Sequence, residues 1–377
     1  MKSLRAADKA TTRGVRVENT RLILQHISDG RGTVSRADLV RFTGLNTATV
    51  SSVVADLCER RLVREAGVGA SIGGKPPILL DLDESAHVVL GVHVARSGYR
   101  IAAVSLRGAI LEQDKGEIDP NTAAAALDAV VDAVERMASR IGLSVLAVGV
   151  AVSGVVDAEG RISRSVSMSW ADVDFGHQLE KQLRFPVYLI NDSDACALAE
   201  LSIRDDQVLS LMALYVGDGV GAGLILSGAL FHGDDFTAGE VGHINLRTHD
   251  LQCECGRRGC LEASARISVL TGRPQSLEVR PGAAPPGMLD KPAAQRAARN
   301  IAALLELIFE LIDIRRTVIC GPVCAYGTQL LDYIREALES NRLYTDGDLV
   351  VENSVLGDTG ALLGAAATAT HQELGLL

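Results

Sequence analysis

A histidine and three cysteines lie close together in the sequence, and this cluster constrains the fold more than any other feature. Cys253, Cys255 and Cys260 fall within eight positions shortly after His243, although the 377 residues include only seven cysteines. Three thiolates and one imidazole at such short spacing form the tetrahedral shells of structural Zn²⁺ sites. Two glycines between the last two cysteines allow the loop to fold back tightly. The sequence therefore predicts a structural zinc site, the alternative being ordinary thiols beside an unrelated histidine.

The composition is typical of a folded, cytoplasmic protein. Hydrophobic residues make up 47% of the chain and aromatic residues only 3%, so the cores must be mainly aliphatic. The length is sufficient for two or three domains. The sequence contains no charged-then-apolar leader and no apolar run of about 18 residues, the length of a membrane span. A clustered cysteine triplet fits metal binding in a reducing compartment, and we expect no membrane partner.

The charge is distributed unevenly along the chain. The net charge is −10, yet residues 1–75 hold 13 Lys and Arg residues against 7 Asp and Glu residues. The remainder is strongly acidic. An acidic protein with a basic N-terminal part is expected to meet nucleic acid through that part alone.

Residues 17–84 have the pattern of a winged helix-turn-helix domain, and the polar residues 1–16 before them are predicted to be flexible. Apolar residues at helical spacing predict a first core helix near the start of the domain. Ser35 then caps a short helix, and a second helix is predicted from Thr47 to Arg60 after a glycine turn. Residues 62–82 are predicted to form two strands around a glycine-rich tip, which is the wing.

Short hydroxyl side chains lie near the start of the second helix, where they can approach phosphates or base edges in a major groove. The wing tip carries a lysine placed to reach a phosphate or the minor groove. The residues predicted to contact DNA are Ser35, Thr47, Thr49, Ser51, Ser52 and Lys75. The alternative for this segment is a small helical interaction module.

Residues 85–377 alternate between strands and helices. Glycine-separated runs rich in β-branched residues from Val88 onward predict a strand meander, and residues 122–141 form a strongly amphipathic helix pattern. Another strand is followed directly by a helix, with Asn191 and Asp192 at the junction. Repeated strand–strand–helix units in two lobes predict α/β layers with a cleft between them.

Several motifs resemble those of the ROK family (repressors, open reading frames, kinases). The block GEVGH…CECGRRGCLE looks like the zinc motif of this family, NDSDACALAE resembles its NDANAAALAE segment, and GDGVGAGLILSG resembles its second phosphate loop. A winged head ending in GGKPP resembles its repressor members. The resemblance covers the chain from about residue 17. It implies a two-lobed actin-like ATPase/sugar-kinase (ribonuclease H-like) fold over residues 85–377, with the zinc motif at 240–262.

The resemblance also implies a polyol-binding pocket. Carboxylates and amides suit this role because each holds one or two hydroxyl groups in fixed directions. The matching residues are Gly154, Asn191, Asp192, Glu240, His243 and Glu262. In the kinases of the family the position of Asp192 supplies the catalytic base, although an N-cap role at the start of a helix is its alternative. Ser167 replaces a sugar-contacting asparagine of the family.

The two phosphate loops depart from the family pattern. His93 stands at the position of an aspartate, Ala95 and Arg96 stand at those of two glycines, and Asp218 stands where threonine is usual. A carboxylate in a phosphate cradle repels the ligand. Because phosphoryl transfer depends on positioning and charge neutralisation, we expect that the chain is not an enzyme.

These patterns together predict a transcriptional regulator, a repressor of carbohydrate genes. It would bind a palindromic operator in double-stranded DNA as a homodimer or homotetramer and respond to a sugar or sugar phosphate. One alternative is an ATP-dependent hexose or N-acyl-hexosamine kinase with a DNA-binding head. Another is an architectural protein whose pocket no longer binds a ligand.

Overall fold

The computed structural model describes residues 12–70, 76–119, 122–204, 208–273, 287–340 and 349–376. The chain divides into two compact units. The head unit comprises residues 1–88, 105–107 and 370–377, and the body unit comprises residues 89–104 and 108–369. Among the described residues, no helix combines the length and the apolar character needed to cross a membrane.

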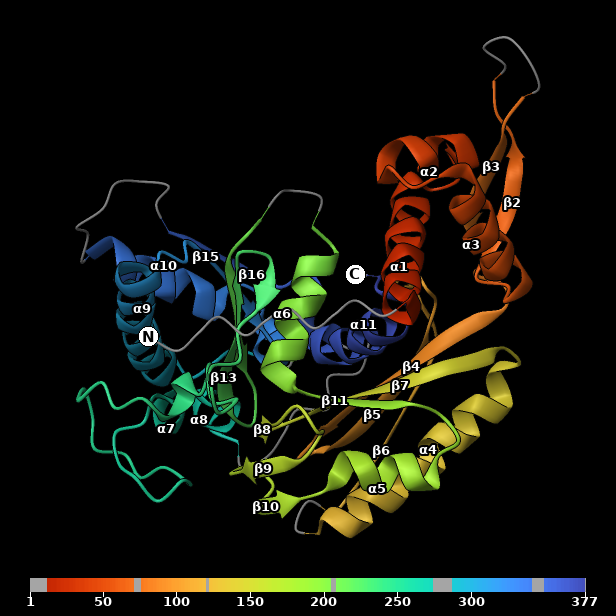
Figure 1. The fold of residues 1–377 in the computed structure, drawn as a ribbon. Coiled ribbons are helices and arrows are strands. Elements are labelled where there is room, and N and C mark those ends of the chain that lie inside the picture. The colour runs from red at the N-terminus through yellow and green to blue at the C-terminus, as the bar shows by residue number, and fades with distance from the viewer. Residues whose placement is uncertain are drawn as a thin grey trace, which may run out of the picture. The chain divides into compact units, whose positions relative to one another are not determined.

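Residues 12–70 and 76–82 of the head unit form three helices and a small sheet (Figure 1). These elements are α1 (Thr12–Gly30), β1 (Val34–Ser35), α2 (Arg36–Thr43), α3 (Thr47–Glu59), β2 (Val63–Val68) and β3 (Ile78–Leu82). Strand β3 lies between β1 and β2 and is antiparallel to both. Helix α3 buries an apolar stripe, Val50, Val53, Val54 and Leu57. The wing strands are present, whereas residues 71–75 of the wing tip lie outside the described residues.

The first helix begins earlier than expected. The prediction assigned residues 1–16 to a flexible segment, but α1 starts at Thr12, so that residues 12–16 are helical. Neither a proline nor a strong cap interrupts the sequence between Thr12 and the packed part of the helix. Adding residues to an existing helix is far easier than starting one, and α1 therefore extends towards the N-terminus.

The described part of the body unit forms two five-stranded sheets and a small three-stranded sheet. The first sheet has the strand order β11-β7-β4-β5-β6, the second β14-β13-β12-β15-β16, and the small sheet β10-β9-β8. The strands of the first sheet are β4 (His87–Ala95), β5 (Gly98–Val104), β6 (Ile110–Gly116), β7 (Ser144–Val152) and β11 (Val187–Asn191). Those of the second are β12 (Leu211–Val216), β13 (Val220–Leu226), β14 (Ala229–Leu230), β15 (Arg316–Cys320) and β16 (Val350–Asn353). The small sheet is formed by β8 (Val155–Val156), β9 (Ile162–Ser165) and β10 (Trp170–Val173).

Helices connect and cover these sheets. The α-helices are α4 (Ala123–Ile141), α5 (Phe175–Gln182), α6 (Asp192–Ser202), α7 (Leu261–Ala265), α8 (Ile267–Thr271), α9 (Lys291–Ile312), α10 (Gln329–Ser340) and α11 (Gly360–Leu374). The short 3₁₀ helices are η1 (Val241–His243), η2 (Pro322–Tyr326) and η3 (Gly357–Thr359). Each five-stranded sheet combines antiparallel strands with a parallel edge, whereas the small sheet is antiparallel. The predicted α/β class with two lobes is confirmed.

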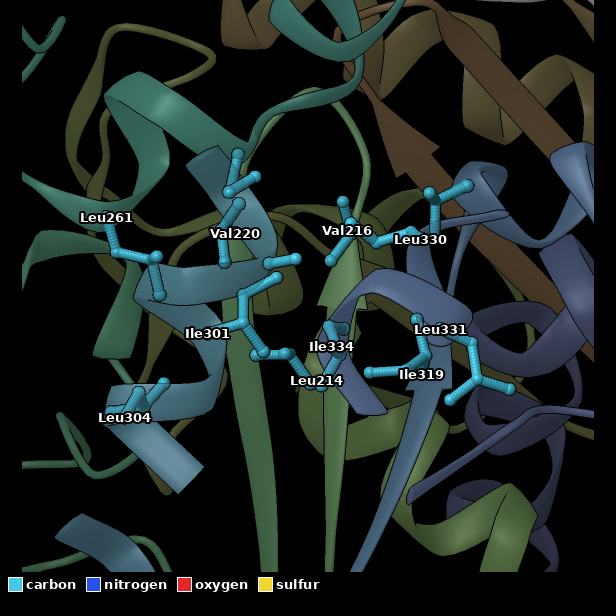
Figure 2. Close-up of a cluster of buried hydrophobic side chains, with 14 of the residues drawn as sticks. Leu214, Val216, Val220, Leu261, Ile301, Leu304, Ile319, Leu330, Leu331 and Ile334 are labelled. Atoms are coloured by element: carbon cyan, nitrogen blue, oxygen red, sulfur yellow. The ribbon is translucent and has the colours of Figure 1, made fainter. Parts of the chain in front are cut away.

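The cores are aliphatic, as the low aromatic content requires. In Figure 2, side chains of β12, β13 and β15 meet side chains of α7, α9 and α10 in one buried cluster. Its labelled members are Leu214, Val216, Val220, Leu261, Ile301, Leu304, Ile319, Leu330, Leu331 and Ile334. A second cluster packs the first sheet against α4 and α5. Burying such side chains stabilises the fold by about 1.5–3 kcal/mol each.

Helix α11 approaches both lobes more closely than side chains would allow. A methyl group at Gly149 of β7 would lie 1.8 Å from the carbonyl oxygen of Ala365, and one at Gly364 would lie 1.8 Å from that of Ala195 in α6. Both distances are far below van der Waals contact. Backbone therefore meets backbone at these two contacts, and only glycine fits.

Candidate functional site

The structure brings the four predicted metal ligands together. The donor atoms of His243, Cys253, Cys255 and Cys260 all lie within 4.8 Å of one another. The Sγ atoms of Cys255 and Cys260 are 3.7 Å apart, and so are Sγ of Cys253 and Nδ1 of His243. Bond lengths of about 2.3 Å to sulfur and about 2.0 Å to nitrogen place tetrahedral ligands roughly 3.6–3.8 Å from each other. The cluster therefore fits a tetrahedral metal ion.

The metal loop, residues 243–260, owes this geometry to its backbone. Gly256 and Gly259 adopt positive φ values of 88° and 75°, and a Cβ atom at Gly259 would lie 2.8 Å from Oδ1 of Asn245. An isolated β-bridge pairs Asn245 with Cys260 and closes the loop. His243 ends the 3₁₀ helix η1, and Cys260 precedes α7. Local backbone structure thus presents all four donors to one point.

One ligand is already disposed towards the thiolate form. Burial raises the pKa of Cys255, but hydrogen bonds from the backbone and side chain of Arg257 outweigh it and lower the pKa to about 7. Burial raises the pKa of Cys253 and Cys260. Because the thiolate is the form that binds metal, loading the site must release protons from these two cysteines.

A cavity of about 420 Å³ adjoins the metal loop. All six predicted polyol-binding residues line it: Gly154, Asn191, Asp192, Glu240, His243 and Glu262. They come from the end of β7, the β11–α6 junction, the η1 region and α7. The volume lies within the range of small-molecule sites. Their shared place in the fold makes a ligand site geometrically feasible, and binding itself stays a prediction.

Asn191, rather than Asp192, caps helix α6. Its Oδ1 accepts hydrogen bonds from the backbone N–H groups of Ser193 (2.8 Å) and Asp194 (3.1 Å), and its Nδ2 donates to the carbonyl oxygen of Gly154 (2.8 Å). These bonds leave at most one amide hydrogen for a ligand. Asn191 therefore mainly positions Gly154 and the helix, and the N-cap alternative for Asp192 does not hold.

Asp192 is buried in the cavity wall, with 5% of its surface exposed. Burial raises its pKa to about 7, although the backbone N–H of Ser193 favours the charged form; the negative charge of Glu240 raises the pKa further. Near neutral pH the carboxyl group is therefore close to its midpoint. It can accept a hydrogen bond from a hydroxyl group when ionised and donate one when protonated.

We expect the Asp192→Asn variant to be more stable than the wild type at about pH 8 but not at about pH 4. As pH rises from 3.8 to about 7, the unfolded chain loses a proton that folded Asp192 retains, so the wild-type fold loses stability that the amide keeps. The gain at high pH should be on the order of a few kcal/mol. Urea unfolding at both pH values measures it, with Asp128→Asn on the exposed face of α4 as control. Equal differences at both pH values would contradict the assignment.

Two glutamates connect the cavity with the metal loop. Oε2 of Glu262 accepts a hydrogen bond from the backbone N–H of Val220 (3.1 Å), and its Oε1 lies 3.6 Å from Sγ of Cys253. Burial raises the pKa of Glu240, the charge of Glu262 raises it further, and that of Arg164 lowers it. The acidic groups thus lie beside the thiol cluster. The affinity for a ligand held by these groups would therefore depend on whether the metal loop is ordered.

Residues that the sequence did not single out also line the cavity. Arg164 of β9 and Arg257 of the metal loop bring two positive charges to it. Ser153, another such residue, accepts a hydrogen bond at 2.9 Å from Oγ of Ser167, which the sequence analysis did single out. Isolated arginines on exposed segments leave no periodic pattern. No sequence signal distinguished them.

Three of the four predicted phosphate-loop positions, His93, Ala95 and Asp218, line a second cavity of about 250 Å³, whereas Arg96 does not. Burial lowers the pKa of His93 to about 4, with a smaller contribution from Arg100, so the imidazole is neutral near pH 7. Its ring meets the Tyr215 ring edge-on at a centroid distance of 6.3 Å. Burial raises the pKa of Asp218.

The predicted DNA contacts divide into three groups. Thr47, Ser51 and Ser52 are exposed on α3, and Thr49 is half-buried beside them. The structure corrects the predicted DNA contact of Ser35. This residue is only 4% exposed, and its hydroxyl group forms a capping box with Asp38, to which it donates a hydrogen bond at 2.7 Å. It therefore serves the start of α2 rather than a DNA surface. Lys75 lies outside the described residues.

Replacing Asn46 with alanine is expected to lower the free energy of unfolding of the head unit by about 1 kcal/mol. Oδ1 of Asn46 accepts a hydrogen bond from the N–H of Thr49 (2.8 Å) and caps the helix that carries the exposed hydroxyls. Chemical denaturation followed by helical circular dichroism measures the loss. Asn46→Ser, which keeps an acceptor, should remain within a few tenths of a kcal/mol. Indistinguishable Ala and Ser variants would argue against a cap.

Comparison with known proteins connects these features. Residues 89–372 match the profile of the ROK family. A xylose repressor of Bacillus spizizenii is 28% identical over 268 residues, 70% of each chain. A kanosamine kinase of Amycolatopsis mediterranei is 32% identical over 252 residues, covering 63% of this chain and 80% of the kinase. The crystal structure of a ROK family transcriptional regulator, a homologue of the E. coli MLC protein, superposes with a TM-score of 0.76 over 95% of this chain and 97% of that one, at 21% identity.

Proposed function

The chain belongs to the ROK family, and we propose that it is a DNA-binding transcriptional regulator that represses carbohydrate genes. The observation that carries the proposal is the exposed hydroxyl edge of α3 in a winged helix-turn-helix head, in the same chain as a polar cavity. Helix α3 has the place of a recognition helix, whose N-terminal part contacts base edges in the major groove. The similarity to a repressor supports the proposal.

The proposed effector is a sugar or sugar phosphate held in the 420 Å³ cavity. Carboxyl groups of Asp192, Glu240 and Glu262 supply the acceptors that neighbouring hydroxyl groups require. To change DNA affinity 100-fold, the ligand must favour one conformational state by about 2.7 kcal/mol. Binding as a symmetric homodimer or homotetramer would match a palindromic operator in double-stranded DNA.

The metal in this proposal is a structural Zn²⁺ ion. When bound, it neutralises the thiolates and holds the four ligands of the metal loop together. His243 belongs to both the ligand set and the cavity wall. The residues of the loop would then keep Glu262 and the cavity in place, in a reducing cytoplasm that leaves the thiols free for metal.

A sugar kinase is the second candidate, favoured by the similarity to kanosamine kinase. Phosphoryl transfer would need a phosphate cradle and a metal-associated carboxylate in the second cavity. His93 places a neutral imidazole where the family has a carboxylate, and the carboxyl group of Asp218 would repel a phosphate when ionised. We therefore infer that the chain does not catalyse this reaction. Phosphorylation of a sugar by ATP with the purified protein, lost in Asp192→Asn, would reverse that conclusion.

Selection of genomic DNA fragments by the purified, zinc-loaded protein at about 150 mM salt tests the regulatory proposal, since weak phosphate contacts are screened there. A shared palindrome near carbohydrate genes is the expected result, and those genes would indicate sugars to test by thermal shift. Recovery of random fragments alone, lost at higher salt, would overturn sequence-specific regulation. A palindrome without a thermal shift by any of these sugars would favour the architectural alternative.

A further inference from the structure

An ion pair joins the metal loop to the first sheet of the body unit. Arg96 lies in the turn between β4 and β5, and its Nη1 is 3.1 Å from Oε2 of Glu254. Glu254 stands between two predicted metal ligands, Cys253 and Cys255. The two partners are 158 positions apart in the sequence. The contact therefore connects distant parts of the fold.

The same carboxylate has a second partner. Nη1 of Arg266 donates to Oε1 of Glu254. Arg266 separates α7 from α8, its backbone N–H donates to the carbonyl oxygen of Glu262 at 3.1 Å, and the next N–H, of Ile267, donates to that of Gly217 at 2.8 Å. One oxygen of Glu254 thus faces the first sheet and the other faces the segment next to the cavity. We name these three residues the Arg96–Glu254–Arg266 bridge.

The surroundings of the bridge allow it to restrain the β4–β5 turn more than an isolated surface ion pair would. An isolated exposed ion pair contributes little, and the side chains of Arg96 and Glu254 are 44% and 40% exposed. Here, however, Arg266 is only 28% exposed and restrains Glu254, so that less side-chain freedom is lost when Arg96 joins. Metal ligands on both sides of Glu254 restrain its backbone further. When the metal loop is ordered, Glu254 can therefore restrain Arg96 and the β4–β5 turn.

We propose that Glu254 and Arg96 are positioning residues that couple the metal loop to the β4–β5 turn across the body unit. Metal binding orders Glu254, and Glu254 holds Arg96 and the turn that continues into the wall containing His93. Loss of the metal frees Glu254 and loosens the turn. This coupling goes beyond the proposed regulatory function and does not depend on it.

Amide hydrogen exchange of the full-length protein, with and without metal, tests the coupling. In the wild type, removing zinc with a chelator is expected to accelerate exchange in residues 95–98 about fivefold, equivalent to about 1 kcal/mol. Arg96→Gln lies outside the metal loop, so it should retain its full metal content. In this variant the turn should exchange at the faster rate whether or not metal is bound.

Two further variants separate coupling from a general loss of structure. Arg258→Gln removes another exposed ion pair, Nη1 to Oδ2 of Asp250 at 2.9 Å, which stays within the metal loop; it should preserve the metal dependence of the turn. Arg96→Lys keeps the positive charge and should restore part of that dependence. High salt should weaken the dependence in the wild type, because exposed charges are screened.

Either of two results would overturn the proposal. Wild-type residues 95–98 could exchange at the same rate with and without metal, which would show that the loop and the turn are independent. Alternatively, Arg96→Gln could retain the full metal dependence, which would show that the signal travels by another route. Metal content measured on each sample ensures that both comparisons are made between loaded and empty protein.

Discussion

Replacing Cys255 with serine is expected to prevent stable metal binding and to abolish the response to an effector. Loss of one thiolate leaves three ligands where a closed structural site needs four. Structural zinc sites contribute on the order of 10 kcal/mol of apparent binding energy, so the metal loop should lose its order. Because the loop and the cavity share His243, and Glu262 lies against Cys253, the cavity should lose its shape as well.

Elemental analysis of the purified protein measures the first effect, and limited proteolysis of the metal loop measures the second. Wild-type protein treated with a chelator should reproduce both results. Cys58→Ser, which changes a half-buried thiol in helix α3, is the matched control and should keep its metal. A stoichiometric metal content in Cys255→Ser, or an unchanged effect of the ligand on DNA binding, would contradict the role assigned to the cluster.

A pair of negative charges on α3 should weaken DNA binding at least about 100-fold. Thr47→Glu with Ser51→Glu places two carboxylates on the exposed edge proposed to enter the major groove, and a symmetric dimer doubles the number. Each opposes the phosphate charges of the duplex, and the glutamates also exclude close approach to base edges. Neither side chain belongs to the buried stripe of the helix, so the fold should persist.

Fluorescence anisotropy with the duplex recovered from genomic selection, at about 150 mM salt, measures this loss. If no specific duplex is recovered, mixed-sequence DNA at lower salt provides the readout. Ser139→Glu with Ser144→Glu adds the same charge at exposed positions of α4 and β7 in the body unit and should leave affinity nearly unchanged. Comparable losses in the two proteins would mean that net charge, rather than the α3 surface, governs binding.

The features that could be predicted from the sequence are formed by residues that lie close together in the chain. The His/Cys cluster could be predicted because its four members lie within one short segment, where their spacing limits the geometry. The cap of α2 was predicted for the same reason, because Ser35 acts on an N–H group three residues away. The six cavity residues came from the family resemblance, and the fold brings them together because they lie near strand ends or at the starts of α6 and α7 and in the neighbouring loops.

What the sequence could not provide were choices between neighbours and pairings over long distances. Asn191 and Asp192 are both good caps, and only the structure shows that the amide takes the role while the carboxyl group is buried. Ser35 was predicted to contact DNA because the residue type alone does not show whether a hydroxyl group is exposed or buried. Arg96 and Glu254 are 158 positions apart in the sequence, and no local sequence pattern predicts that two such residues will pair.

The glycine contacts of α11 limit how the two lobes of the body unit can move. Where a backbone touches a backbone, there is no side chain to change rotamer and absorb a displacement. At Gly149 and Gly364 the helix is fixed in this way to a strand of the first sheet and to a helix beside the second. Sliding along α11 would create a collision within a fraction of an ångström. Rotation of the lobes about the axis of α11 is the motion that these contacts still allow.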